Sequence, residues 1–216
     1  CSNTELVENS DIIILAVKPG YINDVLKEIK GSFSSTKVLA SIAVGISIDS
    51  IKDILGQNAA VVRLMPNIPI LVGEGMTLIC FDNIISSENK EWVIKLFECS
   101  GQVQELEEKL MSEVTALTSS SPAYISIMIE AMADAAVLSG IPRDVSYKLA
   151  TQAVLGTAKL LQESGMHPAQ LKDMVCSPAG TSIEAVQSLE RTAFRSSIME
   201  AMAECTKRAR EIGKQQ

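Results

Sequence analysis

One candidate anion-binding loop is a run of small residues, Ser-Pro-Ala-Gly-Thr-Ser, at positions 177–182. It joins two stretches with helical patterns. Its last two residues are also the first two of Thr181-Ser182-Ile183-Glu184, the capping-box pattern that starts a helix. The backbone N–H groups of Gly180, Thr181 and Ser182 would then converge at a helix N-terminus, between the hydroxyls of Ser177 and Ser182. A carboxylate binds well at such a place, and a side chain at Gly180 would obstruct its approach. From spacing alone, a capped helix without a ligand is the simpler interpretation.

Three loops that each follow a β-rich run form a second candidate site. Their residues are Ala16, Val17, Lys18 and Pro19 after the first run, Ala43, Val44 and Gly45 after the second, and Met65, Pro66 and Asn67 after the third. In open α/β sheets, ligands bind at the carboxyl ends of the strands. Each loop alone is equally well explained as an ordinary turn, because turns use Gly, Pro and Asn. Three such loops on adjacent strands favour a ligand-binding edge.

The pattern of elements predicts two domains. Residues 11–106 alternate between β-rich and helical patterns, which predicts an open α/β sheet. The first predicted strand, residues 12–17, is an almost continuous apolar run and is expected to be buried on both faces, as in a parallel sheet. Further strands are predicted over residues 37–44, 60–65, 76–81 and 101–106. The rest of the chain has helical patterns, so we predict a Rossmann-like domain over residues 1–105 and a helical domain over residues 106–216.

The helix predicted over residues 122–138 is apolar around most of its circumference. Such a helix must be covered by a bundle or by a second chain. Ser121 is expected to be its N-cap, as Ser47 is for a helix over residues 48–55. No apolar run reaches the ~18 residues of a membrane span, so no membrane association is expected.

Composition argues against several classes of function. The net charge is -7 and the basic residues are scattered, so no nucleic-acid partner is expected. The cysteines lie far apart and form no Cys-x-x-Cys pair, which indicates neither a disulfide framework nor a metal site and fits a reducing cytoplasm. The only histidine, His167, precedes Pro168 at a predicted helix start and is expected to cap it, so no histidine-based triad is available.

Six stretches, in this order along the chain, together resemble the pyrroline-5-carboxylate reductase family. They are AVKP (16–19), SIAVGIS (41–47), VVRLMPN (61–67), VTALTSSSPAY (114–124), EAMADAAVLSGIPR (130–143) and HPAQLKDMVCSPAGTSIEAVQSLE (167–190). The resemblance covers nearly the whole chain, and the last block is the most specific. It implies NAD(P)H-dependent reduction of 1-pyrroline-5-carboxylate to L-proline, the last step of proline biosynthesis, with NADP as the expected cofactor and NAD as the alternative.

The resemblance also implies where the ligands bind. A Rossmann domain would hold the cofactor along the three strand-end loops, and the helical domain would interlock with that of a second subunit in a homodimer or a ring of dimers, so that the active site forms at the dimer interface. The substrate carboxylate would lie on Ser177, Gly180 and Thr181, with the hydroxyl of Ser182, the predicted catalytic group, near the ring nitrogen. Hydride transfer to an iminium carbon needs aligned rings more than a strong general acid, which fits this sparse set of side chains.

The sequence departs from the family pattern in three places. Residues 118–121 carry serines where the family often has glycines, and Ala179 and Ser182 stand in place of a glycine and a threonine. A Gly-x-Gly-x-x-Gly turn does not occur, and its place would lie before Cys1, so we expect the first βαβ unit, about 30 residues or more, to be missing. Two alternatives stay open. One is a catalytically silent dimerisation module, and the other is an oxidoreductase like the β-hydroxyacid dehydrogenases, with Lys172 as the candidate catalytic lysine.

Overall fold

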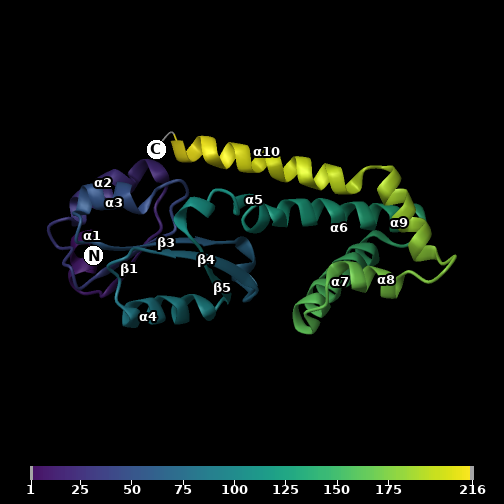
Figure 1. Cartoon of the computed structure of the whole chain (residues 1–216), viewed down its shortest axis with the longest axis horizontal. Helices are drawn as coiled ribbons and strands as arrows, with labels where there is room; N and C mark the ends of the chain where they lie inside the picture. The colour runs from purple at the N-terminus through teal and green to yellow at the C-terminus, as the bar shows by residue number, and fades with distance from the viewer. Residues whose placement is uncertain (1, 215–216) are drawn as a thin grey trace. The chain divides into compact units, whose positions relative to one another are not determined.

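The chain forms two compact units in a computed structural model that describes residues 2–214. We call them the sheet unit, which comprises the chain up to Ser119 together with the segment from Glu204 onward, and the helical unit, Ser120–Ala203. Figure 1 shows the elements of both units along the chain. The domain boundary predicted between residues 105 and 106 stays a prediction.

The sheet unit is built on five strands in the order β1-β2-β3-β4-β5. They are β1 (Ile12–Leu15), β2 (Val38–Ser41), β3 (Ala60–Pro66), β4 (Gly75–Phe81) and β5 (Gly101–Glu105). All neighbouring pairs are parallel except β3 and β4, which are antiparallel. The expected α/β class with a Rossmann-like, mainly parallel sheet is confirmed. β4 runs the other way because only residues 67–74, which include the 3-10 helix η2 (Ile68–Val72), connect it to β3, and a parallel crossover needs a dozen or more.

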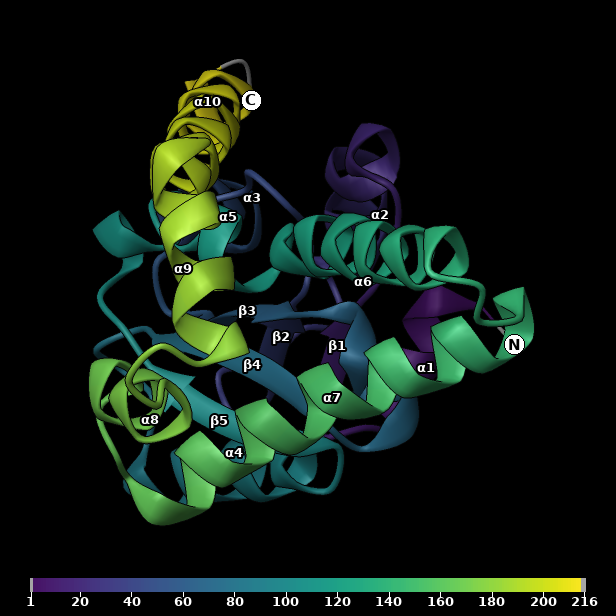
Figure 2. The same cartoon turned by 90° about the vertical axis from the view of Figure 1, so that its right-hand side faces the viewer.

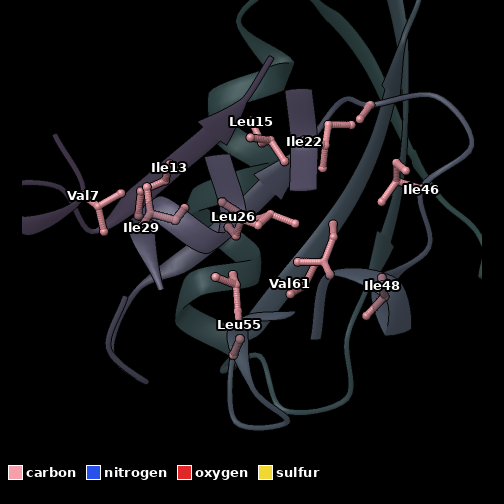
Figure 3. Close-up of a cluster of buried hydrophobic side chains, with 14 of the residues drawn as sticks. Val7, Ile13, Leu15, Ile22, Leu26, Ile29, Ile46, Ile48, Leu55 and Val61 are labelled. Atoms are coloured by element: carbon pink, nitrogen blue, oxygen red, sulfur yellow. The ribbon is translucent and has the colours of Figure 1, made fainter. Parts of the chain in front are cut away.

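Helices cover both faces of this sheet. On one face lie α1 (Asn3–Glu8), α2 (Ile22–Ile29) and α3 (Ile48–Leu55), and on the other lies α4 (Ser87–Glu98) (Figure 1). Figure 3 shows the first core, in which Ile22, Leu26 and Ile29 of α2 meet Ile13 and Leu15 of β1. The spacing of these three α2 residues places them on one side of the helix, which explains their complete burial. The second core joins Val93 and Phe97 of α4 to the opposite face of β2, β3 and β4.

The first strand differs from its prediction. Ile14 is 47% exposed, whereas Ile13 and Leu15 are buried, so β1 is covered on one face only. The reason is its position at the edge of the sheet, where the α4 face has no helix over Ile14 in the described chain. Its paired stretch is also shorter than the apolar run, because Ala16 and Val17 already belong to the turn that leads into the 3-10 helix η1 (Pro19–Tyr21).

The helical unit contains four complete helices and the first part of a fifth. They are α6 (Ser121–Leu138), α7 (Arg143–Ser164), α8 (Pro168–Val175), α9 (Thr181–Arg191) and α10 (Phe194–Lys214), and α10 enters the sheet unit at Glu204. Figure 2 shows the short turn between α6 and α7 and the way α9 leads into α10. The N-cap of α6 is Ser120, so the expectation that Ser121 takes this position was wrong by one residue, because helical geometry already begins at Ser121. The remaining elements, η3 (Glu108–Leu110) and α5 (Thr115–Thr118), belong to the sheet unit.

The apolar helix α6 is largely exposed in the single chain. Ala133 is its one buried residue, and an apolar groove with about 400 Å³ of open space lies between α6 and α7, lined by side chains such as Met128, Met132 and Leu161. The segment Thr115–Leu138 is long and apolar enough to cross a membrane by length and composition, so the expectation that no stretch reaches this length was wrong. That criterion is weak evidence for a membrane, because a helix covered by a second subunit passes it as well.

Candidate active site

The carboxyl edge of the sheet carries the three predicted loops. Ala16, Lys18 and Pro19 are exposed beyond β1, and Lys18 takes an extended conformation before η1, where its carbonyl accepts the backbone N–H of Tyr21 at 2.9 Å. This hydrogen bond gives the turn a fixed form at the exposed edge of the sheet. The turn does not line the pocket described next, so its assignment to the cofactor stays a prediction.

The loop between β2 and α3 is held from both ends. At its start the hydroxyl of Ser41 accepts the backbone N–H of Ala43 at 3.3 Å, and at its end Ser47 caps α3, as the sequence predicts, by accepting the backbone N–H of Ser50 at 3.1 Å. Between them Gly45 has φ +83°, a left-handed conformation that other residues adopt only at a cost. Val44 is 55% exposed, so this loop presents its backbone and one apolar side chain at the edge.

A pocket brings two of the three loops together. It is lined by Ile42, Ala43, Val44 and Gly45 after β2, by Arg63, Leu64 and Met65 of β3, and by Met111, Ser112, Thr115 and Ala209. Ala209 lies on the part of α10 that belongs to the sheet unit. Pockets at the carboxyl ends of parallel strands are the usual place for a dinucleotide in this class of sheet.

The side chain of Asn67, which is predicted to contact the cofactor, makes hydrogen bonds that hold the edge of the sheet together. Its Oδ1 accepts the backbone N–H of Met76 at 2.8 Å, and its Nδ2 donates to the carbonyl oxygen of Thr118 at 3.1 Å. The amide thus ties the end of β3 to the start of β4 and to the end of α5. A contact between the backbone of residues 65–67 and a cofactor stays a prediction.

A carboxylate at the edge was not predicted from the sequence. Glu108 of η3 accepts two hydrogen bonds on one oxygen, from Nη1 of Arg63 at 3.0 Å and from the backbone N–H of Ile48, the first residue of α3, at 2.9 Å. A negative charge is favoured at that helix N-terminus. The only signal for this group in the sequence is Arg63, the single charge inside the apolar run of β3, and its partner lies 45 residues away.

Cys80 lies opposite Arg63 in the antiparallel pair of β3 and β4. It is 7% exposed, and this burial is the main cause that raises the pKa of its thiol above the ordinary value of 9.0, with the Glu108 carboxylate as a second cause. The thiol is therefore protonated and unreactive at neutral pH.

The loop of residues 177–182 lies in the helical unit between α8 and α9. His167 caps α8 as expected, because its Nδ1 accepts the backbone N–H of Ala169 at 3.1 Å. The capping box predicted at residues 181–184 is not formed. Gly180 is the N-cap of α9 and has no side chain with which to cap it. The helix begins one residue earlier than the box requires because the chain turns at Ala179, which has φ +55°.

This shift leaves the first turn of α9 without a side-chain cap. The first N–H groups of a helix have no partner inside it, so at α9 they are open to water or to an anion. Ser182 is half-buried in that first turn, and Thr181 is exposed. The observed loop therefore fits the carboxylate-binding interpretation better than the capped-helix one.

Position 180 requires a glycine because Ser177 lies against it. The carbonyl oxygen of Ser177 accepts the backbone N–H of Gly180 at 3.0 Å, which closes a tight turn. A Cβ atom at Gly180 would lie 2.3 Å from Oγ of Ser177 and 3.0 Å from its carbonyl oxygen. The hydroxyl of Ser177 thus lies directly over the Gly180 backbone, beside the first turn of α9.

Other chemistry finds little support in the described residues. In residues 2–214, no group of three or more His, Cys, Asp or Glu side chains is arranged to hold a metal ion. Lys172, the candidate lysine of the dehydrogenase alternative, lies on α8 with its side chain partly exposed and pairs with Asp173 at 3.0 Å.

Comparisons with known proteins confirm the resemblance seen in the motifs. A family model described as pyrroline-5-carboxylate reductase dimerisation matches residues 108–212, and one described as NADP oxidoreductase, coenzyme F420-dependent, matches residues 1–45. A pyrroline-5-carboxylate reductase of Escherichia coli (strain K12) is 44% identical over 213 residues, which cover 99% of this chain and 79% of that protein.

Solved structures give the same result. The Plasmodium falciparum pyrroline carboxylate reductase with NADP bound has a TM-score of 0.89 and 35% identity, covering 99% of this chain and 81% of that one. A pyrroline-5-carboxylate reductase from Coxiella burnetii has a TM-score of 0.93 and 31% identity, covering 98% and 79%. In sequence and in fold, this chain belongs to the pyrroline-5-carboxylate reductase family.

Proposed function

We propose that this protein reduces 1-pyrroline-5-carboxylate to L-proline with NADPH, the last step of proline biosynthesis. Membership of the family carries the proposal, since the E. coli relative matches 99% of this chain. The exposed first turn of α9, with Ser177, Gly180, Thr181 and Ser182 around it, supports it independently because the substrate is a small carboxylate.

The carboxyl edge of the sheet fits a dinucleotide. Ala16, Lys18, Pro19 and Val44 are exposed there, and the left-handed Gly45 lets the second loop turn without a side chain in the way. We assign Ala16, Val17, Lys18, Pro19, Ala43, Val44, Gly45, Met65, Pro66 and Asn67 to cofactor binding, as predicted. Bound NADPH supplies the hydride that reduces the C=N carbon of the substrate.

The chain's own residues bind and orient the imine. The N–H groups at the start of α9 hold the substrate carboxylate, with the Ser177 hydroxyl beside them, and the helix dipole favours the negative charge. The imine reacts as its iminium form, whose nitrogen already carries a proton, so Ser182 needs only to accept a hydrogen bond from that N–H and fix the ring. Orientation of this kind is sufficient for a large part of the rate of such a transfer.

The test compares two serines of the same helix. Replacing Ser182 by alanine should lower kcat/KM by about 5- to 150-fold, which corresponds to about 1 to 3 kcal/mol for one hydrogen bond to a charged group. Ser188→Ala removes an exposed hydroxyl further along α9 and should leave turnover unchanged. Equal rates for Ser182→Ala and Ser188→Ala would rule out the assigned role. A wild-type protein that fails to oxidise NADPH with the imine would favour the silent-module alternative.

Self-association follows from the dimerisation model that matches residues 108–212. We propose that a second copy covers α6, and that dimers assemble further into rings in the cytoplasm. Glu130 and Asp134 are exposed on α6, and each carboxylate would cost about 2.5 to 3.5 kcal/mol at the centre of a bilayer, which argues for a protein partner over lipid. Light scattering of the purified protein checks this, because a monomeric mass at micromolar concentration would contradict it.

A further inference from the structure

A connecting segment, residues 108–118, crosses the cofactor edge of the sheet unit and is bonded to it at several points. Glu108 binds Arg63 of β3, and the carbonyl of Thr118 accepts the Asn67 amide. Between these ends the hydroxyl of Thr115 contacts the sulfur of Met65 at 3.7 Å. The segment is therefore part of the wall against which the loop of residues 43–45 lies, and its position affects the shape of the pocket there.

The C-terminal part of α10 is held on this connecting segment by a bidentate ion pair. Arg210 donates from Nε to Oε1 of Glu113 at 2.8 Å and from Nη2 to Oε2 at 2.5 Å. The paired guanidinium holds the pKa of the Glu113 carboxyl below its usual value. The two residues are 97 positions apart, so this contact joins the end of the chain to the middle.

Two further observations place the same part of α10 at the pocket. Ala209, the neighbour of Arg210, lines the pocket together with Ala43, Val44 and Gly45. One turn later, a Cβ atom at Gly213 would lie 3.9 Å from Oγ of Ser112 on the connecting segment. The end of α10 thus forms one wall of the pocket and makes contact with the segment that forms another.

We propose that the Arg210–Glu113 pair positions the end of α10 as a wall of the cofactor pocket, so that Arg210 and Glu113 set the affinity for the dinucleotide without touching it. This inference rests on the proposed function for the identity of the ligand. Neither residue is a catalytic residue, and the imine-binding loop of residues 177–182 contains neither of them.

Arg208 provides a matched control. It lies on the same helix and has the same charge, but its Nη1 pairs with Glu211 of its own helix at 2.9 Å. Arg210→Ala removes the long-range pair and Arg208→Ala removes only a local one. In the full-length protein we expect Arg210→Ala to raise the Kd and KM for NADPH about two- to fivefold, the range of an exposed ion pair. The KM for the imine and the melting temperature should stay at the values of Arg208→Ala.

A charge-reversed pair tests whether the position of α10, and not the charge at residue 210 alone, sets the affinity for NADPH. Arg210→Glu sets two carboxylates together and should weaken NADPH binding further, and adding Glu113→Arg should restore most of the affinity. Kd is measured by NADPH fluorescence without imine, so that it does not depend on turnover. If Arg210→Ala and Arg208→Ala bind NADPH equally, or if only the melting temperature changes, the inference is overturned. If wild-type protein binds NADPH with the expected difference between variants but does not reduce the imine, the proposed function fails and the positioning role stands.

Discussion

Replacing Gly180 by alanine should damage imine binding through a steric conflict with Ser177. The new Cβ atom would lie 2.3 Å from Oγ of Ser177, which forces that hydroxyl to rotate away from its place beside α9. It would also lie 3.0 Å from the carbonyl oxygen of Ser177, which cannot move far because it accepts the Gly180 N–H. Gly180 itself has φ -82°, so alanine can adopt its backbone conformation and the cost is one of crowding alone.

Crowding of this size costs about 1 to 3 kcal/mol. If the strain is relieved by displacing the loop from its binding geometry, the KM for 1-pyrroline-5-carboxylate rises by about 5- to 150-fold, while the KM for NADPH is unchanged. Steady-state NADPH oxidation with each substrate varied in turn measures both. The reasoning is tested by repeating the change in a Ser177→Ala background, where no Oγ atom is present. There Gly180→Ala should cost much less. An equal cost in both backgrounds would refute the steric explanation, and an unchanged imine KM would refute the assignment of the loop to the carboxylate.

Two further outcomes follow from the backbone and the buried thiol. Ala179→Gly should stabilise the protein against denaturant by about 0.5 to 1 kcal/mol. The change relieves about 1 to 2 kcal/mol of left-handed strain, and this gain is partly offset by about 0.4 to 1 kcal/mol from the larger entropy of the unfolded chain. Ala201→Gly inside α10 is the control and should destabilise the protein, and a loss of stability in both variants would contradict the strain argument. Alkylation of native protein near neutral pH should modify exposed Cys99 and spare Cys80, whose pKa is raised mainly by burial. Because the folded pKa of Cys80 lies above the unfolded one, its contribution to stability is complete below the unfolded value of about 9 and is lost as the pH rises through the folded value. Labelling of Cys80 at the rate of Cys99, followed by mass spectrometry, would contradict its burial.

Local patterns in this sequence were sufficient to predict most of the fold. The strand runs and the caps at Ser47 and His167 depend on residues only a few positions apart, so they could be read directly. The strand ends could not, because apolar residues such as Val17 and Val44 continue past the point where the hydrogen-bonded ladder stops. The direction of β4 depends on the length of a connection and not on composition.

The candidate site also has parts that the sequence predicts and parts that it does not. The small residues of the 177–182 loop were visible as a run, but the exact start of α9 depends on the left-handed turn at Ala179, which sequence pattern alone does not show for an alanine. The groups that hold the edge of the sheet were not visible, because Glu108 meets Arg63 across 45 positions and Arg210 meets Glu113 across 97. Such pairs exist only once the chain is folded.

The helical unit has a consequence for the biosynthesis of the protein itself. Across Ser120–Ala203, every residue of which is described, the buried positions are Ala133, Ser146 and Ala150, all of them small. So little buried apolar surface cannot offset the entropy of ordering this part of the chain. The helices of this unit are therefore expected to fold only when a second copy covers them, whereas the strands, which are synthesised earlier, have buried cores within their own chain. The melting point of these helices should depend on protein concentration by mass action, and cells that make little of the protein would hold a larger fraction of it with the helical unit unfolded and open to proteases.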